Sequence, residues 1–366
     1  MRILSFCMMA LLLTACHTRR PATPAELTML VGTYTSGESR GIYSFRFNQE
    51  TGASAPLATT DVSNPSYLTV SADKRFVYAV SEESDTTSAL NAFALDAATG
   101  KLRLLNRRPT YSAAPCYVST NGREVLTANY GGGTMAVFPL NADGSIGPVD
   151  TLFEGSTGGT DSVRQATPHI HCALYSPDGK YIFATDFSAD RILRFAVHPK
   201  NCVPFRSEET FSVAPGSGPR HLTFSADGAF AYLISELSGN VTAFRYHDGQ
   251  LETIQTIAAD TLRARASADI HLSGDGRYLY ASNRRQGDGI AVFAVDAATG
   301  QLSAVGYQPT ALHPRNFALT PNGRFLLVAC RDSGCIQVFA RDADTGLLRD
   351  THQDIRLDKP VCIRFV

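Results

Sequence analysis

Histidine, arginine and glutamate side chains recur at two fixed distances from a turn that repeats along the chain. An imidazole can take a proton from water near neutral pH, and a guanidinium offers fixed charged donors to an oxyanion, a phosphate or a carboxylate. Eight residues before the turn, allowing for one turn that is two residues shorter, stand Ser66, Cys116, His171, Arg220, Ala268, Arg315 and, by analogy, Val361. Eight residues after it stand Glu82, Tyr130, Phe187, Glu236, Arg284, Arg331 and, by analogy, Tyr34.

These two positions are neighbours at one end of an antiparallel hairpin. If the hairpins are arranged in a ring, both positions line one mouth of its central channel. Seven of the fourteen residues are His, Arg or Glu, whereas 18% of the chain is charged, and a buried core would not tolerate such a set. Any single charge could be a solvated rim group. The set as a whole predicts a functional mouth, because charged groups that converge on a concave surface are typical of a site.

Other polar residues lie near these positions. His169 is one step further out than His171 on the same face, and we expect it to support binding. His221, Asp269 and Asn316 face the opposite way, and we expect them, like His271, to form hydrogen bonds within or between the repeated units. The residues expected to contact a substrate are His169, Arg315, Arg331, Tyr130 and Glu82.

Two strand patterns position these residues. The first is a hairpin such as "SPDGKYIFATDF", which occurs in six copies with turn residues spaced by 48, 57, 49, 48 and 47 residues. Its Asp-Gly or Asn-Gly step supplies the positive φ of a tight turn. The second is an alternating strand often closed by Thr-Gly, as in "IAVFAVDAATG", which occurs in seven copies. Four strands in about fifty residues are typical of a β-propeller blade.

The ends of the chain supply the missing hairpin. "KPVCIRFV" at the C-terminus has the character of an innermost strand, and "LTMLVGTYT" near the N-terminus that of a second strand. We therefore predict an all-β fold: one seven-bladed β-propeller over residues 28–366, with four-stranded antiparallel blades and a ring closed by one C-terminal strand and three N-terminal ones. An open solenoid is the alternative, but it would not need a split unit.

The first residues predict export. In residues 1–16, one basic residue precedes an apolar run from Ile3 to Leu13, which is too short to span a bilayer. The run ends in Leu-Thr-Ala-Cys, which resembles a lipobox and predicts a lipid on Cys16. Residues 17–27 would be a tether, and the protein a membrane-anchored lipoprotein on the periplasmic or cell-surface side. An ordinary secretory signal is the alternative.

Composition limits the partners. A net charge of −1 gives no indication of a nucleic-acid or acidic-lipid partner. The six cysteines after Cys16 show no CxxC or His-Cys zinc spacing, so we expect mostly buried free thiols. We expect a monomer that binds a small molecule and meets the membrane only through its lipid.

Several segments identify the chain as similar to a known family. "VGTYTSGESRGIYSFRF", "TANYGGGTMAVFPL", "PHIHCALYSPDGKYIFATDFSADRI" and "GPRHLTFSADG" closely resemble the propeller-type 6-phosphogluconolactonases. That family also includes the fungal carboxy-muconate lactonizing enzyme. The resemblance covers about residues 29–366.

The resemblance implies four catalytic residues, which are His171, Arg220, Glu236 and Arg284. Opening a lactone needs a nucleophilic water, a stabilised oxyanion and a protonated alkoxide. His171 would be the general base, Arg220 and Arg284 would bind anions, and Glu236 would orient a neighbour or shuttle a proton. We expect no cofactor and no metal, because a mouth rich in Arg and His suits Ca²⁺ poorly.

The expected reaction is hydrolysis of a sugar-derived δ-lactone, as in the 6-phosphogluconolactonases. Phosphogluconolactone is made in the cytoplasm, so an exported protein implies a different lactone unless the export signal is misread. Two alternatives stay open: a muconate-type lactonizing lyase, and an exported non-catalytic propeller that binds a carbohydrate or a protein.

Overall fold

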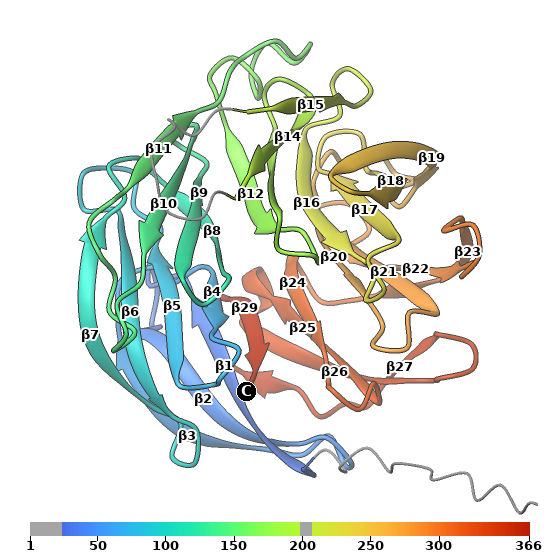
Figure 1. Ribbon diagram of the computed structural model, residues 1–366. Helices are drawn as coiled ribbons and strands as arrows, with labels where there is room; N and C mark the ends of the chain where they lie inside the picture. The colour runs from blue at the N-terminus through green and yellow to red at the C-terminus, as the bar shows by residue number, and fades with distance from the viewer. Residues whose placement is uncertain (1–23, 198–206) are drawn as a thin grey trace, which may run out of the picture.

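Seven antiparallel sheets surround a common axis in the computed structural model, which describes residues 24–197 and 207–366 (Figure 1). Each sheet is one blade, and its strands run in order from the axis to the rim, so the predicted seven-bladed propeller is confirmed. Among the described residues, no helix has the length and apolar character needed to cross a membrane.

The four layers of strands follow the predicted repeat. The innermost strands are β4 (Leu68–Val70), β8 (Pro115–Thr120), β12 (Ile170–Tyr175), β16 (Pro219–Phe224), β20 (Ser267–Leu272), β24 (Pro314–Leu319) and β29 (Pro360–Phe365). The second strands are β5 (Phe76–Ser81), β9 (Glu124–Asn129), β13 (Tyr181–Asp186), β17 (Phe230–Ser235), β21 (Tyr278–Asn283), β25 (Phe325–Cys330) and β1 (Glu26–Thr33). The third strands are β6 (Ala89–Asp96), β10 (Thr134–Pro139), β14 (Arg191–Ala196), β18 (Asn240–His247), β22 (Gly289–Val295), β26 (Cys335–Arg341) and β2 (Gly41–Asn48). The outer strands are β7 (Lys101–Pro109), β11 (Thr151–Glu154), β15 (Glu209–Ser212), β19 (Gln250–Ala258), β23 (Leu302–Pro309), β27 (Leu348–Asp350), the short β28 (Ile355–Arg356) and β3 (Ser54–Asp61).

The ring closes as the sequence predicts. The C-terminal strand β29 pairs with β1, and β1, β2 and β3 complete that sheet. Strand β1 begins at Glu26, so the predicted tether of residues 17–27 extends too far by two residues. The reason is packing, because Leu27 is buried opposite Phe47 of β2. The predicted signal peptide, Cys16 and the tether up to residue 23 lie outside the described residues.

Turns and packing explain why the repeat folds in this way. The turn glycines Gly122, Gly179, Gly228, Gly276 and Gly323 have φ between 69° and 83°, and Lys74 takes their place in the first copy with φ of 60°. A positive φ is easily reached by glycine and costs other residues more. Most second strands are buried on both faces, and apolar clusters fill the space between neighbouring blades. The core is therefore shared by adjacent sheets.

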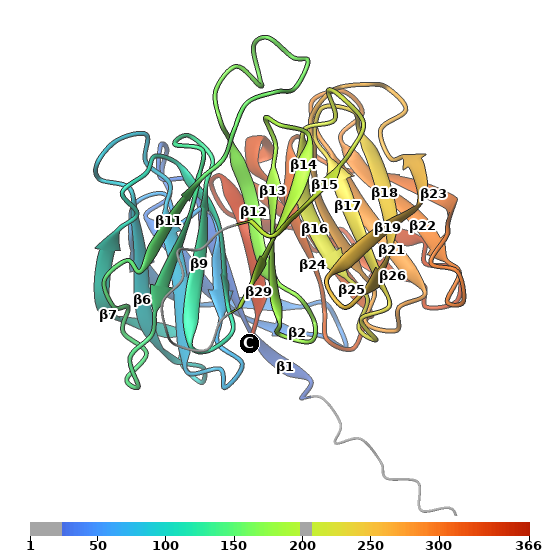
Figure 2. The same ribbon diagram turned by 45° about the horizontal axis from the view of Figure 1, so that its top comes forward.

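The direction in which each strand runs along the axis determines which of its ends lies near the site. Innermost strands begin, and second strands end, at the same end of the ring, which we call the mouth. Strand β1 therefore begins at the opposite end, and its last residue precedes Tyr34 at the mouth. Figure 2 shows the connection between β11 and β12 rising above the mouth, while β1 starts at the far side.

Candidate active site

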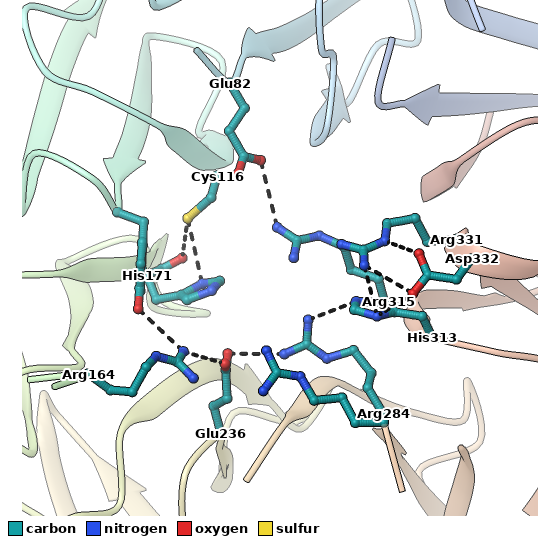
Figure 3. A pocket seen from close by; sticks show the side chains of 12 residues that line it. Glu82, Cys116, Arg164, His171, Glu236, Arg284, His313, Arg315, Arg331 and Asp332 are labelled. Carbon is teal, nitrogen blue, oxygen red and sulfur yellow. Dashed lines mark hydrogen bonds and ion pairs between the residues drawn. The ribbon is translucent and has the colours of Figure 1, made fainter. Parts of the chain in front are cut away.

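A cavity of about 380 Å³ lies at the mouth (Figure 3). Its lining consists of Glu82, Cys116, Tyr130, Arg164, His171, Glu236, Arg284, Arg285, His313, Arg315, Arg331 and Asp332. Eight of these twelve residues come from the two positions that the repeat singled out. Five arginines face three carboxylates in the lining, so with neutral histidines the wall carries a net charge of +2. Such a wall favours an anionic ligand.

A β-bulge turns residues of four innermost strands toward the axis of the ring. In β12, Ile170 pairs with Asp186 and Cys172 pairs with Thr185, so His171 has no partner in the ladder. The same extra residue is Cys116 in β8, Arg220 in β16 and Arg315 in β24. A bulge bends its strand and re-aims the extra side chain, so one local feature turns these four side chains toward the axis.

The carboxylate of Glu236 is shared by three arginines. Oε2 lies 3.0 Å from Nε of Arg220 and 3.2 Å from Nη2 of Arg284, and Oε1 lies 2.7 Å from Nη2 of Arg164. Burial alone would raise the pKa of Glu236, but Arg284, Arg220 and Arg164 lower it to about 2. Glu236 is therefore a permanent anion that orients arginines, and this argues against the proton shuttle we considered for it.

The imidazole of His171 projects into the cavity across from Arg315 and His313 (Figure 3). Its Nδ1 lies 3.6 Å from Sγ of Cys116, and its ring meets the rings of Tyr130 and His221 edge to face. Burial, with the positive charge of Arg220, holds the pKa of His171 well below its usual range. The ring is therefore neutral at pH 7, as a general base must be.

Two of the expected residues lie behind the cavity wall. Arg220 is 2% exposed, and its guanidinium contacts Glu236, the carbonyl of Ala268 and His221. It is not among the lining residues, because these partners hold it beneath Glu236. His169 is also absent from the lining: its ring stacks on Tyr130 with centroids 4.0 Å apart, and its Nδ1 donates to the carbonyl of Tyr130 at 2.6 Å.

Glu82 is the central residue of another part of the cavity wall. The hydroxyl of Tyr34 donates to both carboxylate oxygens of Glu82, at 3.0 and 2.9 Å. The guanidinium of Arg315 lies 3.7 Å from the same carboxylate and 5.4 Å from the centre of the Tyr34 ring. Arg331 completes this side beside Asp332, with Nε and Oδ1 2.6 Å apart. Arg315, Arg331, Tyr130 and Glu82 thus all reach the cavity as expected.

Four lining residues escaped the sequence analysis: Arg164, Arg285, His313 and Asp332. All four lie on connections outside the repeated hairpin. One signal was available, because His313 stands ten residues before Gly323, as His169 stands ten residues before Gly179. Comparing the residue ten positions before the turn in every blade would have identified His313.

A second polar cluster lies deeper in the ring and is structural, as predicted. Nδ1 of His221 lies 2.7 Å from Oδ1 of Asp269, and Nε2 of His271 lies 2.9 Å from Oδ2. The amide of Asn316 donates to Asp269 and accepts from the backbone of Ile363 at 2.7 Å. These bonds join four adjacent blades.

The cysteines of the described residues are all free thiols. Five cysteines are buried free thiols, which agrees with the expectation: Cys116, Cys172, Cys330, Cys335 and Cys362. The sixth, Cys202, lies outside the described residues. Within residues 24–197 and 207–366, no group of three or more His, Cys, Asp or Glu side chains could hold a metal ion.

Comparison with known proteins agrees with the resemblance noted above. The sequence model of the family described as "Lactonase, 7-bladed beta-propeller" matches residues 28–365. The 6-phosphogluconolactonase of Bacillus subtilis is 35% identical over 92% of this chain and 97% of its own, and that of Formosa agariphila is 34% identical over 89% and 96%.

Solved structures agree as well. A Bacteroides uniformis protein, 66% identical, superposes with a TM-score of 0.93 over 94% of this chain and 100% of its own. The periplasmic gluconolactonase of Pseudomonas aeruginosa, 38% identical, superposes with a TM-score of 0.89 over 93% of this chain and 99% of its own. This chain therefore belongs to the seven-bladed β-propeller lactonase family.

Proposed function

We propose that the protein is a lactone hydrolase that opens a sugar-derived δ-lactone, with a preference for lactones that carry an anionic group. The observation that carries the proposal is a neutral, buried His171 facing a cavity whose wall has an excess of arginine. Relatives named 6-phosphogluconolactonase and gluconolactonase support the same reaction class.

The proposed chemistry uses groups of the chain alone. His171 takes a proton from water, and the resulting hydroxide adds to the lactone carbonyl. The negative charge that develops on the carbonyl oxygen is stabilised by an arginine of the lining, and we assign this role to Arg284, which is held beside Glu236. The bond between the carbonyl carbon and the ring oxygen then breaks, and the departing alkoxide takes the proton back from the imidazolium. The product is the open hydroxy acid.

The remaining residues have binding and supporting roles in this proposal. Arg315, Arg331 and Arg285 lie on the wall opposite His171 and suit a phosphate or carboxylate on the substrate. Arg220 is fully buried and donates to Glu236. We therefore assign it the role of holding the Glu236 carboxylate, in place of the direct anion binding expected from the sequence.

A screen of lactones tests the proposal. Proton release at constant pH would be followed for 6-phosphogluconolactone and for plain gluconolactone, with the wild type and the His171→Ala variant side by side. We expect the wild type to open the phosphorylated lactone faster than the plain one, and the variant to lose roughly a hundredfold in rate. Rates equal to buffer for both proteins would exclude the proposed activity.

We also propose export as a monomeric lipoprotein. The apolar run and the Leu-Thr-Ala-Cys sequence support it, as does similarity to a gluconolactonase described as periplasmic. Replacing Cys16 by Ser should move the protein from the membrane fraction to the soluble fraction, whereas Cys7→Ser should not. Recovery of the protein with Met1 intact and no membrane-bound form would contradict this.

A further inference from the structure

The cavity holds a second histidine that the proposed reaction does not use. His313 lies on the connection between β23 and β24, opposite His171, and 8% of it is exposed. Its Nδ1 lies 3.1 Å from Oδ2 of Asp332, and its Nε2 lies 3.3 Å from Nη1 of Arg284. Figure 3 shows the Arg284 guanidinium between Glu236 and this ring.

We assign the tautomer of His313 from its contact with Arg284. A guanidinium can only donate, so the contact with Arg284 is a hydrogen bond only if Nε2 has no proton. The proton then sits on Nδ1, which lies 3.1 Å from Oδ2 of Asp332. Nη2 of Arg331 also approaches Nδ1, at 3.1 Å, but it donates to Asp332 as well, also at 3.1 Å. The opposite tautomer would set an N–H of His313 against an N–H of Arg284.

The backbone holds the ring in place. The N–H of His313 donates to the carboxylate of Asp288 at 2.6 Å, and its carbonyl accepts from the N–H of Arg331 at 3.1 Å. Its φ is 63°, in the left-handed region. Asn64 occupies the equivalent position of another blade with φ of 41°, so this conformation belongs to the blade and asparagine tolerates it.

Arg284 has one donor left for a substrate. Of its five N–H groups, the one on Nε donates to the carbonyl of Ala266 at 2.7 Å. Nη2 donates to the carbonyl of Ser267 at 3.4 Å and pairs with Glu236 at 3.2 Å. One N–H of Nη1 meets His313, and the other has no hydrogen-bond partner among the described residues. Because a guanidinium is planar, the contacts with Ala266, Glu236 and His313 together set the direction of that last N–H.

We propose that His313, oriented by Asp332, is a positioning residue that aims the free Nη1–H of Arg284 at the oxyanion formed during lactone opening. The inference rests on the proposed function and adds to it a residue pair outside the four that the family resemblance implies. Its role differs from that of a general base, since the lone pair of Nε2 is occupied by Arg284. A donor aimed before the reaction starts stabilises developing charge without reorganisation cost.

Two substitutions at the same position test this. His313→Asn places a side-chain amide near Asp332 and suits the left-handed backbone, but it removes the acceptor at the Nε2 position. His313→Gln can place an amide oxygen close to that position. We expect His313→Asn to lower kcat for lactone opening about tenfold with KM changed less than about threefold, since a misdirected oxyanion donor acts on the transition state. His313→Gln should recover most of the loss.

Thermal unfolding of both variants would show that they fold. If His313→Asn keeps the kcat of the wild type, or if both variants are equally impaired, the positioning role is excluded while the proposed function stands. If the wild type opens no lactone, the proposed function itself fails, and this inference fails with it.

Discussion

The thiol of Cys116 lies 3.6 Å from Nδ1 of His171, in the place where a carboxylate often orients a catalytic histidine. The same thiol donates to the carbonyl of His171 at 3.4 Å. A thiol is a weak donor and a weak acceptor, so it can favour one orientation of the ring without transferring charge to it. The imidazole of His171 is therefore positioned by its ring contacts with Tyr130 and His221 more than by one strong hydrogen-bond partner.

Replacing Cys116 by Ala should have a small effect on catalysis. Because an S–H hydrogen bond is weak, we expect kcat to fall by less than about tenfold, against roughly a hundredfold for His171→Ala. Initial rates under saturating lactone would measure both. If Cys116→Ala removed activity as completely as His171→Ala, the thiol would have a direct chemical role.

The dependence of the rate on pH should be displaced toward acid. Burial and the charge of Arg220 lower the pKa of His171 well below 6.5, so the neutral base persists where an ordinary histidine would be protonated. We expect kcat/KM to stay constant from pH 8 down to at least pH 6, after correction for spontaneous hydrolysis. Half of the activity lost near pH 6.5 would show that the base is not the buried His171.

Stability should respond to pH in a related way. His171, His221 and His313 are neutral in the folded protein: burial and neighbouring arginines lower the pKa of His221 and of His313 to about 3, and that of His171 also falls. These groups bind protons near pH 6.5 only after unfolding. The free energy of unfolding is therefore unaffected above that pH and falls below it, by roughly 1.4 kcal/mol per pH unit for each histidine.

Urea unfolding at pH 7.5, 6 and 5 would measure this slope. The carboxyl pKa values lowered in the fold, such as that of Glu236, act in the same direction only below about pH 4.5. A stability that does not change between pH 7 and 5 would show that these histidines become protonated in the native state.

Removing the charge of Glu236 should destabilise the fold as well as the site. Glu236→Gln leaves Arg220 and Arg284 buried without their carboxylate, and we expect a loss of about 3 kcal/mol in the free energy of unfolding. Glu50→Gln is the matched control, because Glu50 pairs with Arg324 on the surface and should change stability by less than about 1 kcal/mol. Equal effects of the two substitutions would mean that the arginines are held by other contacts.

Internal repeats made much of this site predictable from a single sequence. The distance from each turn identified the mouth residues, because every blade places the same two positions at the same end of the ring. The bulge that turns His171 and Arg315 inward was not readable, since the extra residue of the ladder is seen only in its pairing with the neighbouring strand.

The repeat could not predict how deeply a side chain is buried, nor which residues the loops contribute to the cavity. The register placed Arg220 correctly around the ring but could not show that it lies beneath Glu236, because depth depends on which neighbours fill the space above. Arg164 is supplied by the connection between β11 and β12, which has no counterpart in the repeat. No periodic signal could have identified it.

The course of β1 determines how a lipid-anchored form would stand on its membrane. This strand enters the fold at the end of the ring opposite the cavity and climbs eight residues, or about 25 Å, to reach the mouth. An anchor upstream of it would place the end of the ring opposite the cavity toward the bilayer. The arginine-rich opening would then face the aqueous compartment, away from the anionic headgroups that would otherwise compete with a substrate for its charge.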